Sequence, residues 1–227
     1  MRLVLLGPPG AGKGTQAHRL ADRFGIPLIA TGDIFRSNVE RDTVLGREAR
    51  RYMDSGELVP DEVVVAMVVG ALEAAPDGFI LDGFPRNLAQ AEALETELER
   101  TEQPLSAALA FSIRDDTAVK RLVGRRTCTT CQRTYNLALH PPKVGGVCDV
   151  CGGRLEQRQD DREDTVRRRL EIYHESTEPL MGFYAGRDLL RTVDAEGSEE
   201  EVAERAERAV GLVTGGQGPP ARARHER

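Results

Sequence analysis

The residues best suited to chemistry begin near the N-terminus, in a glycine-rich segment. Residues 7–15 read GPPGAGKGT, follow the short apolar stretch 1–6 and open a segment with helical spacing. In that context backbone N–H groups can wrap a phosphate at the positive end of a helix, and Lys13 can reach the transferred group. A glycine-rich turn that binds nothing is the alternative. The usual pattern has Ser or Thr directly after the lysine, whereas here Gly14 precedes Thr15. The segment alone therefore predicts a phosphate-binding kinase or NTPase.

Four cysteines form a second group with a recognisable spacing. Cys128-x-x-Cys131 and Cys148-x-x-Cys151 are separated by sixteen residues. This pattern fits two knuckles that donate four thiolates to a tetrahedral Zn²⁺. Disulfides within each pair would be strained, and a redox site needs one such pair beside a βαβ start. Four protein ligands leave no open position for a substrate, so we expect a structural metal site.

Basic residues matter because the formal net charge is −6. Phosphate binding must then rely on locally concentrated Arg and Lys. Arg121 and Arg125 are four residues apart in a predicted helix at 115–126, so they would share one face of it. Two solvated arginines are the alternative to a phosphate clamp.

Asp82 is the candidate for holding Mg²⁺. It ends the apolar run 78–81, which we expect to be a buried strand. A carboxylate there can hold Mg²⁺ through the ion's water shell, because Mg²⁺ rarely gives up all its waters. A turn-forming Asp before Gly83 is the alternative.

Short apolar segments alternate with helical ones along the chain. Parallel strands need crossovers and bury both faces, so this order predicts an α/β fold with a doubly wound, five-stranded parallel sheet. The expected strands are 1–6, 26–30, 78–81, 107–113 and 189–193. The expected helices are 12–24, two short ones within 31–59, one opening at Pro60, 85–100, 115–126, a long one from 160 onward, and 198–213. One face of the long helix would carry Val166, Leu170, Tyr173, Thr177, Leu180 and Tyr184. Residues 127–157 break the pattern, and 214–227 lose all periodicity, which predicts a disordered tail.

Composition bounds the class of protein. Charged residues make up 30% and hydrophobic ones 40%, as in soluble globular proteins. The acidic balance and the 4% aromatic content argue against nucleic-acid and membrane partners. The apolar start is too short for a signal peptide, and the run 63–72 is about half of the ~20 residues that a spanning helix needs. We expect a cytoplasmic protein.

The form of the phosphate loop resembles that of adenylate kinases, and the resemblance extends over the first ~213 residues through further segments in the same order. These are residues 31–33 (TGD) with Arg36, residues 81–86 (LDGFPR), residues 123–126 (VGRR), and residues 158–161 (RQDD) followed by residues 165–169 (TVRRR). The resemblance implies reversible transfer of the terminal phosphoryl group of ATP to AMP, giving two ADP, with adenine nucleotide homeostasis as the role. It also implies a monomer that uses Mg²⁺ with ATP.

The same resemblance implies a domain organisation. The P-loop core would comprise 1–30, 60–123 and 162–213, with sheet order 2-3-1-4-5. Residues 31–59 would form an insertion that binds the nucleoside monophosphate, and residues 124–161 a zinc-binding lid.

On the ATP side the resemblance implies a site made of the phosphate loop and arginines. Arg121 and Arg125 would clamp phosphates at the lid hinge. Arg158 and Arg169 would bridge both nucleotides on closure, since a guanidinium fork grips phosphate oxygens bidentately. The implied catalytic residues are Lys13, Arg86, Arg121, Arg125, Arg158 and Arg169. The implied ATP-binding residues are Gly10, Ala11, Gly12, Lys13, Gly14, Thr15, Arg125, Thr134, Tyr135 and Gly197.

On the AMP side, Arg36 and Arg86 would hold the phosphate. Gln90 would pair with the adenine edge as donor and acceptor together, which favours AMP over other monophosphates. The implied AMP-binding residues are Thr31, Arg36, Glu57, Leu58, Val59, Gly83, Phe84, Pro85, Arg86, Gln90, Arg158 and Arg169.

Two residues depart from the family pattern, which often has Thr where Asn87 stands and Lys where Gln159 stands. Two other functions remain alternatives. A UMP/CMP kinase is disfavoured by the long zinc lid and by Gln90. A zinc-ribbon nucleic-acid-binding protein that uses ATP as a switch would need a basic, aromatic-rich surface.

Overall fold

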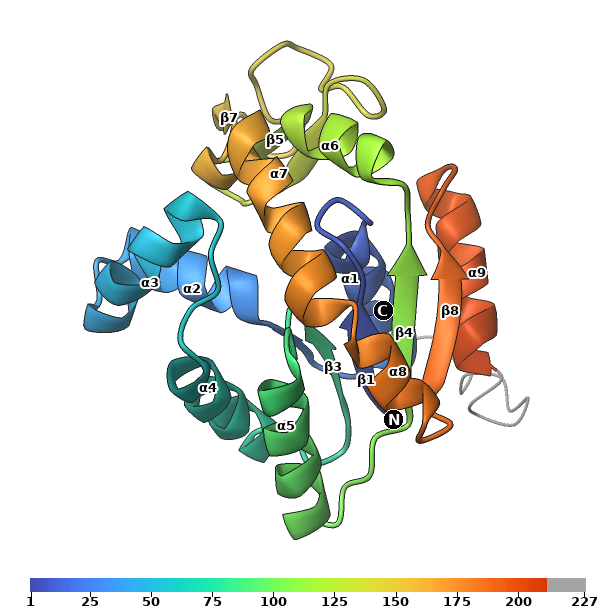
Figure 1. The fold of residues 1–227 in the computed structure, drawn as a ribbon. Coiled ribbons are helices and arrows are strands. Elements are labelled where there is room, and N and C mark those ends of the chain that lie inside the picture. The colour runs from blue at the N-terminus through green and yellow to red at the C-terminus, as the bar shows by residue number, and fades with distance from the viewer. Residues whose placement is uncertain (212–227) are drawn as a thin grey trace, which may run out of the picture.

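The structure is a computed structural model, of which residues 1–211 are described; the predicted tail at 214–227 lies outside this range. Strands and helices alternate along the chain (Figure 1). The strands are β1 (Arg2–Leu6), β2 (Leu28–Ala30), β3 (Phe79–Asp82), β4 (Ala107–Ser112), β5 (Arg125–Cys128), β6 (Thr134–Asn136), β7 (Leu155–Glu156) and β8 (Leu190–Asp194). The helices are α1 (Lys13–Phe24), α2 (Thr31–Glu40), α3 (Val44–Ser55), α4 (Asp61–Glu73), α5 (Leu88–Arg100), α6 (Asp115–Val123), α7 (Glu163–Ile172), α8 (Leu180–Ala185) and α9 (Glu199–Gly211).

Within residues 1–211 the main sheet has five parallel strands in the order β2-β3-β1-β4-β8, which confirms the expected doubly wound α/β fold. Successive side chains of a strand point to opposite faces. Leu3 and Leu5 accordingly pack in the core with residues of α1 and α9, whereas Val4 and Leu6 pack in the core with residues of α4, α5 and α8. Both faces of the sheet are covered, so β1 is apolar almost throughout.

The strand register brings the glycine-rich loop, Thr31 and Asp82 to one edge of the sheet. Leu5 of β1 lies beside Asp82 of β3, and Ala30 of β2 lies on the other side of Asp82. The glycine-rich loop that follows β1 and the start of α2 at Thr31 therefore flank Asp82. In open parallel sheets the carboxyl ends of the strands form the usual ligand-binding edge.

The predicted helix at 115–126 was wrong in its C-terminal part. Helix α6 ends at Val123, and Arg125 begins β5, which pairs with β6 and β7 in a small antiparallel sheet. The side chain of Asn136 donates to the carbonyl of Arg121 at 2.9 Å and so caps the C-terminal end of α6. Arg121 and Arg125 therefore do not share a helix face. The local helical spacing was overridden by strand pairing over residues 125–136.

The long helix predicted from residue 160 is present but is divided. A 3-10 turn, Gln159–Asp161, precedes α7, and a π-helical turn, Tyr173–Thr177, connects it to Pro179 and α8. The expected buried face is confirmed, because Val166, Leu170, Tyr173, Thr177, Leu180 and Tyr184 are all buried. This helix passes beside the main sheet (Figure 1).

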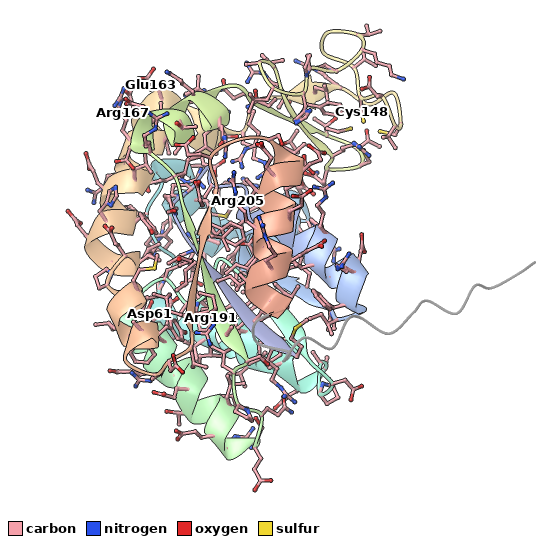
Figure 2. The ribbon with its side chains drawn as sticks, turned by 90° about the vertical axis from the view of Figure 1, so that its right-hand side faces the viewer. Asp61, Cys148, Glu163, Arg167, Arg191 and Arg205 are labelled. Carbon is pink, nitrogen blue, oxygen red and sulfur yellow. The ribbon has the colours of Figure 1, made fainter. Side chains whose placement is uncertain are left out.

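The segment between α6 and α7 projects beyond the main sheet, as the position of Cys148 in Figure 2 shows. Its own core is small and consists of Cys128, Tyr135, Cys148 and Leu155. Among residues 1–211, no helix has the length and apolarity that a membrane span requires.

His174 connects the π-helical turn to α6. Its Nδ1 lies 2.8 Å from Glu178 Oε2 and its Nε2 lies 3.0 Å from Asp115 Oδ2. The bond to Glu178, followed by that to Asp115, raises the pKa of His174 above its ordinary value of 6.5. A raised folded-state pKa stabilises the fold fully below the unfolded-state pKa, and this stabilisation is lost as pH rises through the folded-state pKa.

We predict that His174→Gln destabilises the protein only at low pH. At about pH 5.5 the loss in unfolding free energy should be at most about 1 kcal/mol, because the pair is exposed and screened, and at about pH 8.5 it should vanish. Urea unfolding at both pH values measures this, with the exposed His18→Gln of α1 as control. A loss that is equal at both pH values would contradict the charged bridge.

Candidate active site

The glycine-rich loop joins β1 to α1 with glycines in conformations that other residues rarely adopt. Gly10 has φ +88°, and a Cβ there would lie 2.8 Å from the carbonyl oxygen of Ala118. Gly12 has φ +83° and precedes α1 without a side chain that caps the helix. The first-turn N–H groups of α1 are therefore not satisfied by a capping side chain, which is the arrangement of an anion-binding loop.

Lys13 and Asp82 lie together at the carboxyl edge of the sheet. Lys13 Nζ donates to the carbonyls of Gly7 at 2.6 Å and Pro8 at 2.8 Å. Burial lowers the pKa of Lys13 to about 8, and Asp82 partly opposes this shift. Burial also raises the pKa of Asp82, against the attraction of Lys13. A Cβ on Gly14 would lie 3.4 Å from Asp82 Oδ2, so this carboxylate faces the start of α1.

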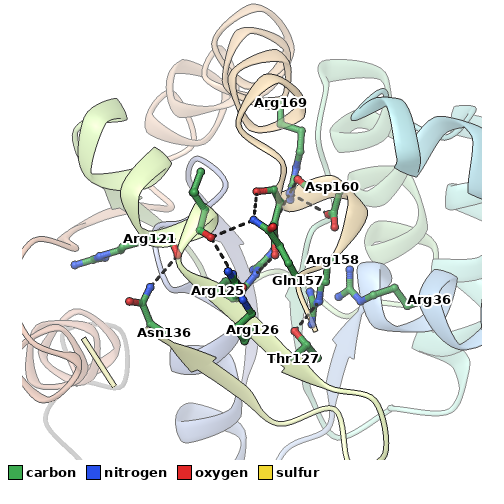
Figure 3. A network of polar contacts seen from close by, with 12 residues as sticks. Arg36, Arg121, Arg125, Arg126, Thr127, Asn136, Gln157, Arg158, Asp160 and Arg169 are labelled. Carbon is green, nitrogen blue, oxygen red and sulfur yellow. Dashed lines mark hydrogen bonds and ion pairs between the residues drawn. The ribbon is translucent and has the colours of Figure 1, made fainter. Parts of the chain in front are cut away.

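Arginines from β5 and α7 are held by two adjacent carboxylates (Figure 3). Arg125 makes a bidentate pair with Asp161, with Nε–Oδ2 and Nη2–Oδ1 distances of 2.7 and 2.5 Å, and the Asp161 side chain is fully buried. Arg169 Nη1 lies 2.9 Å from Asp160 Oδ2. The bidentate pair fixes the plane of the Arg125 guanidinium group.

Arg158 completes this group from the residue before the 3-10 turn. Its Nε donates to Thr127 Oγ1 at 3.0 Å, and Arg36 of α2 approaches it from the opposite side (Figure 3). Gln157 joins the end of α6 to the 3-10 turn, because its Nε2 donates to the carbonyls of Val123 and Asp161. Gln157 and Thr127 were not predicted from the sequence, because neither stands in a recognisable motif.

The basic groups are close enough to disfavour one another's charge. Burial, followed by the charge of Arg169, lowers the pKa of Arg86 to about 10. Burial also lowers the pKa of Arg158 to about 10, with added effects of Arg36 and Arg125. The pKa of Arg169 is also lowered, with burial as the largest cause. A cluster of half-buried cations that repel one another binds polyanions well, because phosphate oxygens would relieve both the repulsion and the lost hydration.

A pocket beside this cluster combines polar and apolar walls. Thr31 Oγ1 donates to the carbonyl of Gly83 at 3.0 Å, and Arg86 Nε donates to the same carbonyl at 2.8 Å. Arg36 forms an ion pair with Asp33 at the mouth. The pocket is lined by Thr31, Gly32, Phe35, Arg36, Met53, Gly56, Glu57, Leu58, Val59, Val64, Gly83, Arg86, Gln90, Asp160 and Arg169. Phe84 and Pro85 are absent from this lining; Phe84 is buried in the core.

Gln90 reaches this pocket with its amide already engaged. Its side chain is 1% exposed. Oε1 accepts from the backbone N–H of Arg86 at 2.8 Å, and Nε2 donates to Asp61 Oδ1 at 2.7 Å. Asp61 was not predicted from the sequence, because an acid in the first turn of a helix is common and carries no sign of a site.

Several expected site residues lie apart from the arginine cluster. Arg121 donates to the carbonyls of Ala195 at 3.1 Å and Gly197 at 3.2 Å, so its guanidinium points toward the loop after β8 and away from Arg125 (Figure 3). Tyr135 directs its hydroxyl toward Cys148 Sγ at 3.4 Å. Thr134 is exposed. Tyr135 can therefore offer a ligand its backbone but not its hydroxyl.

The four cysteines gather at one point in the projecting segment. Their sulfur atoms all lie within 4.8 Å of one another. Tetrahedral zinc with Zn–S bonds of about 2.3 Å places its sulfurs about 3.8 Å apart, so this cluster could hold such an ion. The hydrogen bond with the Tyr135 hydroxyl is the largest of the effects that lower the pKa of Cys148 to about 6. The lowered pKa favours the thiolate of Cys148.

Comparisons with known proteins point to one family over most of the chain. A family model described as adenylate kinase matches residues 5–189. An adenylate kinase of Acidothermus cellulolyticus is 53% identical over 212 residues, covering 92% of this chain and 98% of that protein. An adenylate kinase of Thermodesulfovibrio yellowstonii is 53% identical over 204 residues, covering 89% and 95%. One of Streptomyces avermitilis is 53% identical over 209 residues, covering 91% and 95%.

Proposed function

The chain belongs to the adenylate kinase family and transfers a phosphoryl group between ATP and AMP; from this premise we propose which of its residues carry out the transfer. The observation that carries the proposal is the convergence of Lys13 with Arg86, Arg125 and Arg169, whose charges each lower the pKa of Lys13. Arg158 joins this group beside Arg125, whose charge lowers the pKa of Arg158. These groups come from separate elements. A coupled assay of ADP formation across nucleoside monophosphates tests the activity and its base preference.

Phosphoryl transfer requires alignment and charge neutralisation more than it requires a nucleophilic side chain. The backbone N–H groups at Gly12 to Thr15 and the Lys13 ammonium bind the ATP phosphates. Arg125, Arg158 and Arg169 neutralise the equatorial oxygens of the transferred group. Arg121 contributes positive charge toward the ATP phosphates from its position beside Gly197. The backbone at Gly197 contacts the adenine of ATP. None of these steps moves a proton to the protein.

The acceptor site is the pocket beside α2 and α4. Arg36 and Arg86 hold the AMP phosphate, and Gln90 reads the base, within the pocket that these side chains line. Phe84 and Pro85 shape the backbone that carries Arg86. The phosphate of AMP then faces Lys13 across the carboxyl edge of the sheet.

The reaction has to exclude water, so we propose that residues 31–59 and 124–161 are the moving parts and that 1–30, 60–123 and 162–213 form the core. Two contacts support this. Gln132 Nε2 donates to Glu40 Oε1 at 3.0 Å across the gap between the two moving parts, and Arg168 pairs with Glu57 at 2.9 Å. Closure in this manner brings the arginines onto both nucleotides.

Mg²⁺ with ATP belongs to the family's chemistry, and Asp82 is the residue that would hold its water shell. When bound, the ion neutralises charge on the phosphates. The position of Asp82 supports this, since its carboxylate faces the start of the helix that carries Lys13 and Thr15.

We further propose that Cys128, Cys131, Cys148 and Cys151 hold a structural Zn²⁺. The sulfur spacing supports it, and the four thiols are free. The free thiols also support a reducing, cytoplasmic location. A monomeric state remains a prediction that size-exclusion chromatography tests.

We predict that Lys13→Met lowers kcat by about 10²-fold or more, because the variant loses a half-buried cation aimed at the transferred phosphate. Circular dichroism should show an intact fold. The exposed Lys120→Met of α6 is the matched control and should keep its turnover. Near wild-type kcat in folded Lys13→Met would overturn the role of this residue.

Gln90→Leu should raise KM for AMP much more than KM for ATP, because the amide meets only the monophosphate base. Steady-state kinetics with each nucleotide varied in turn measures both constants. The melting temperature should be followed as well, since Asp61 and the Arg86 N–H lose a partner. Equal changes in both KM values would contradict the assignment.

The zinc proposal predicts one Zn per purified chain by elemental analysis. Cys148→Ser should lower the melting temperature and open residues 127–157 to proteolysis, because metal binding is coupled to folding of the segment that holds it. Turnover at low temperature should largely survive. Absence of Zn from carefully reduced protein would refute the site, and total loss of activity in a folded mutant would refute a purely structural role.

A further inference from the structure

Asp61 is the centre of a hydrogen-bond network that joins α4, α5 and the chain before α5. Its Oδ1 accepts from Gln90 Nε2 at 2.7 Å. Asn87 Nδ2 lies 3.0 Å from Oδ1 and 3.1 Å from Oδ2 of the same carboxylate. Neither the phosphate chemistry nor the metal sites use this residue.

The network fixes which end of the Gln90 amide is which. A carboxylate can only accept hydrogen bonds, so it must face Nε2, and a backbone N–H can only donate, so that of Arg86 must face Oε1. Turning the amide over would set oxygen against the carboxylate and NH₂ against N–H. Only one orientation therefore satisfies both neighbours. One N–H and one lone pair of Gln90 remain for a ligand.

Asp61 is itself held in place. Asn87 Oδ1 accepts from the backbone N–H of Gln90 at 2.9 Å and so caps α5, which leaves Asn87 Nδ2 facing the carboxylate. The Asn87 amide is thus oriented by the same rule of donors and acceptors. The first turn of α4 also favours a negative charge at Asp61.

The orientation of the Gln90 amide decides which purine it can pair with. Adenine offers an N6–H donor and an N1 acceptor, whereas a 6-oxopurine offers an O6 acceptor and an N1–H donor at the same two positions. A glutamine that can turn over satisfies either base. A glutamine that cannot turn over leaves polar groups unpaired against the wrong one, which is how binding sites reject close analogues.

We propose that Asp61 is a positioning residue for base specificity: by locking the Gln90 amide in one orientation, it restricts the monophosphate site to 6-aminopurines and excludes 6-oxopurines. This inference rests on the proposed role of Gln90 as the reader of the base.

The test is Asp61→Asn, a nearly isosteric change that removes the acceptor-only constraint. In the coupled assay with saturating ATP, the ratio of kcat/KM for AMP to that for IMP should fall about tenfold, which corresponds to about 1.4 kcal/mol, or one hydrogen bond. KM for ATP should stay unchanged. Glu62→Gln removes an exposed acid from the same helix turn and is the matched control, with an unchanged ratio.

A second variant covers the case in which Asp61→Asn does not fold. Asn87→Ala removes the donors that hold the carboxylate, so it should shift the AMP to IMP ratio in the same direction by a smaller factor. An unchanged ratio in the folded variant would count against the network.

The Gln90→Leu background separates this inference from the proposed function. If Asp61 acts through Gln90, the double variant Asp61→Asn with Gln90→Leu has the same ratio as Gln90→Leu alone. A ratio that Gln90→Leu leaves unchanged would refute the reader and the inference together. A ratio lowered by Gln90→Leu but not by Asp61→Asn would overturn the inference alone, as would equal losses for AMP and IMP with a lowered melting temperature.

Discussion

Several cations lie close together in half-buried positions and must remain charged there, and the arrangement of the other elements follows from this. Burial lowers the pKa of Lys13 to about 8 and those of Arg86 and Arg158 to about 10. Asp160 and Asp161 offset part of this cost, since one pairs with Arg169 and the other with Arg125. In the proposed function the nucleotide phosphates supply the remaining neutralisation. Binding of the substrates therefore relieves the repulsion between the cations.

The fold divides this task between rigid and less constrained elements. The parallel sheet brings the phosphate loop, Thr31 and Asp82 to one edge, where their positions follow from strand register. The arginines at 125, 158 and 169 belong to the segments that connect the sheet to the projecting part of the chain. In the proposed function this separation would allow substrate-dependent closure without disturbing the core, an arrangement used by enzymes that must exclude water.

The acceptor side shows a different means of control. In our proposal, specificity there depends on hydrogen-bond direction rather than on charge density. Asn87 and Asp61 orient one another and Gln90 through groups that can only donate or only accept. Asn87, which departs from the usual residue of the family, takes part in this network and caps α5 at the same time.

The sequence by itself determined the strand, loop and helix around Lys13, the alternation of the sheet, the buried face of the long helix and the cysteine quartet. These features depend on spacing within a few residues, where backbone geometry is repetitive. The tertiary structure alone decided that Arg125 begins a strand and pairs with Asp161, that Arg121 points toward Gly197, and that Asp61 holds Gln90. In that order, these partners are separated by 36, 76 and 29 residues. Their choice depends on how distant segments pack, and local spacing carries no information about that.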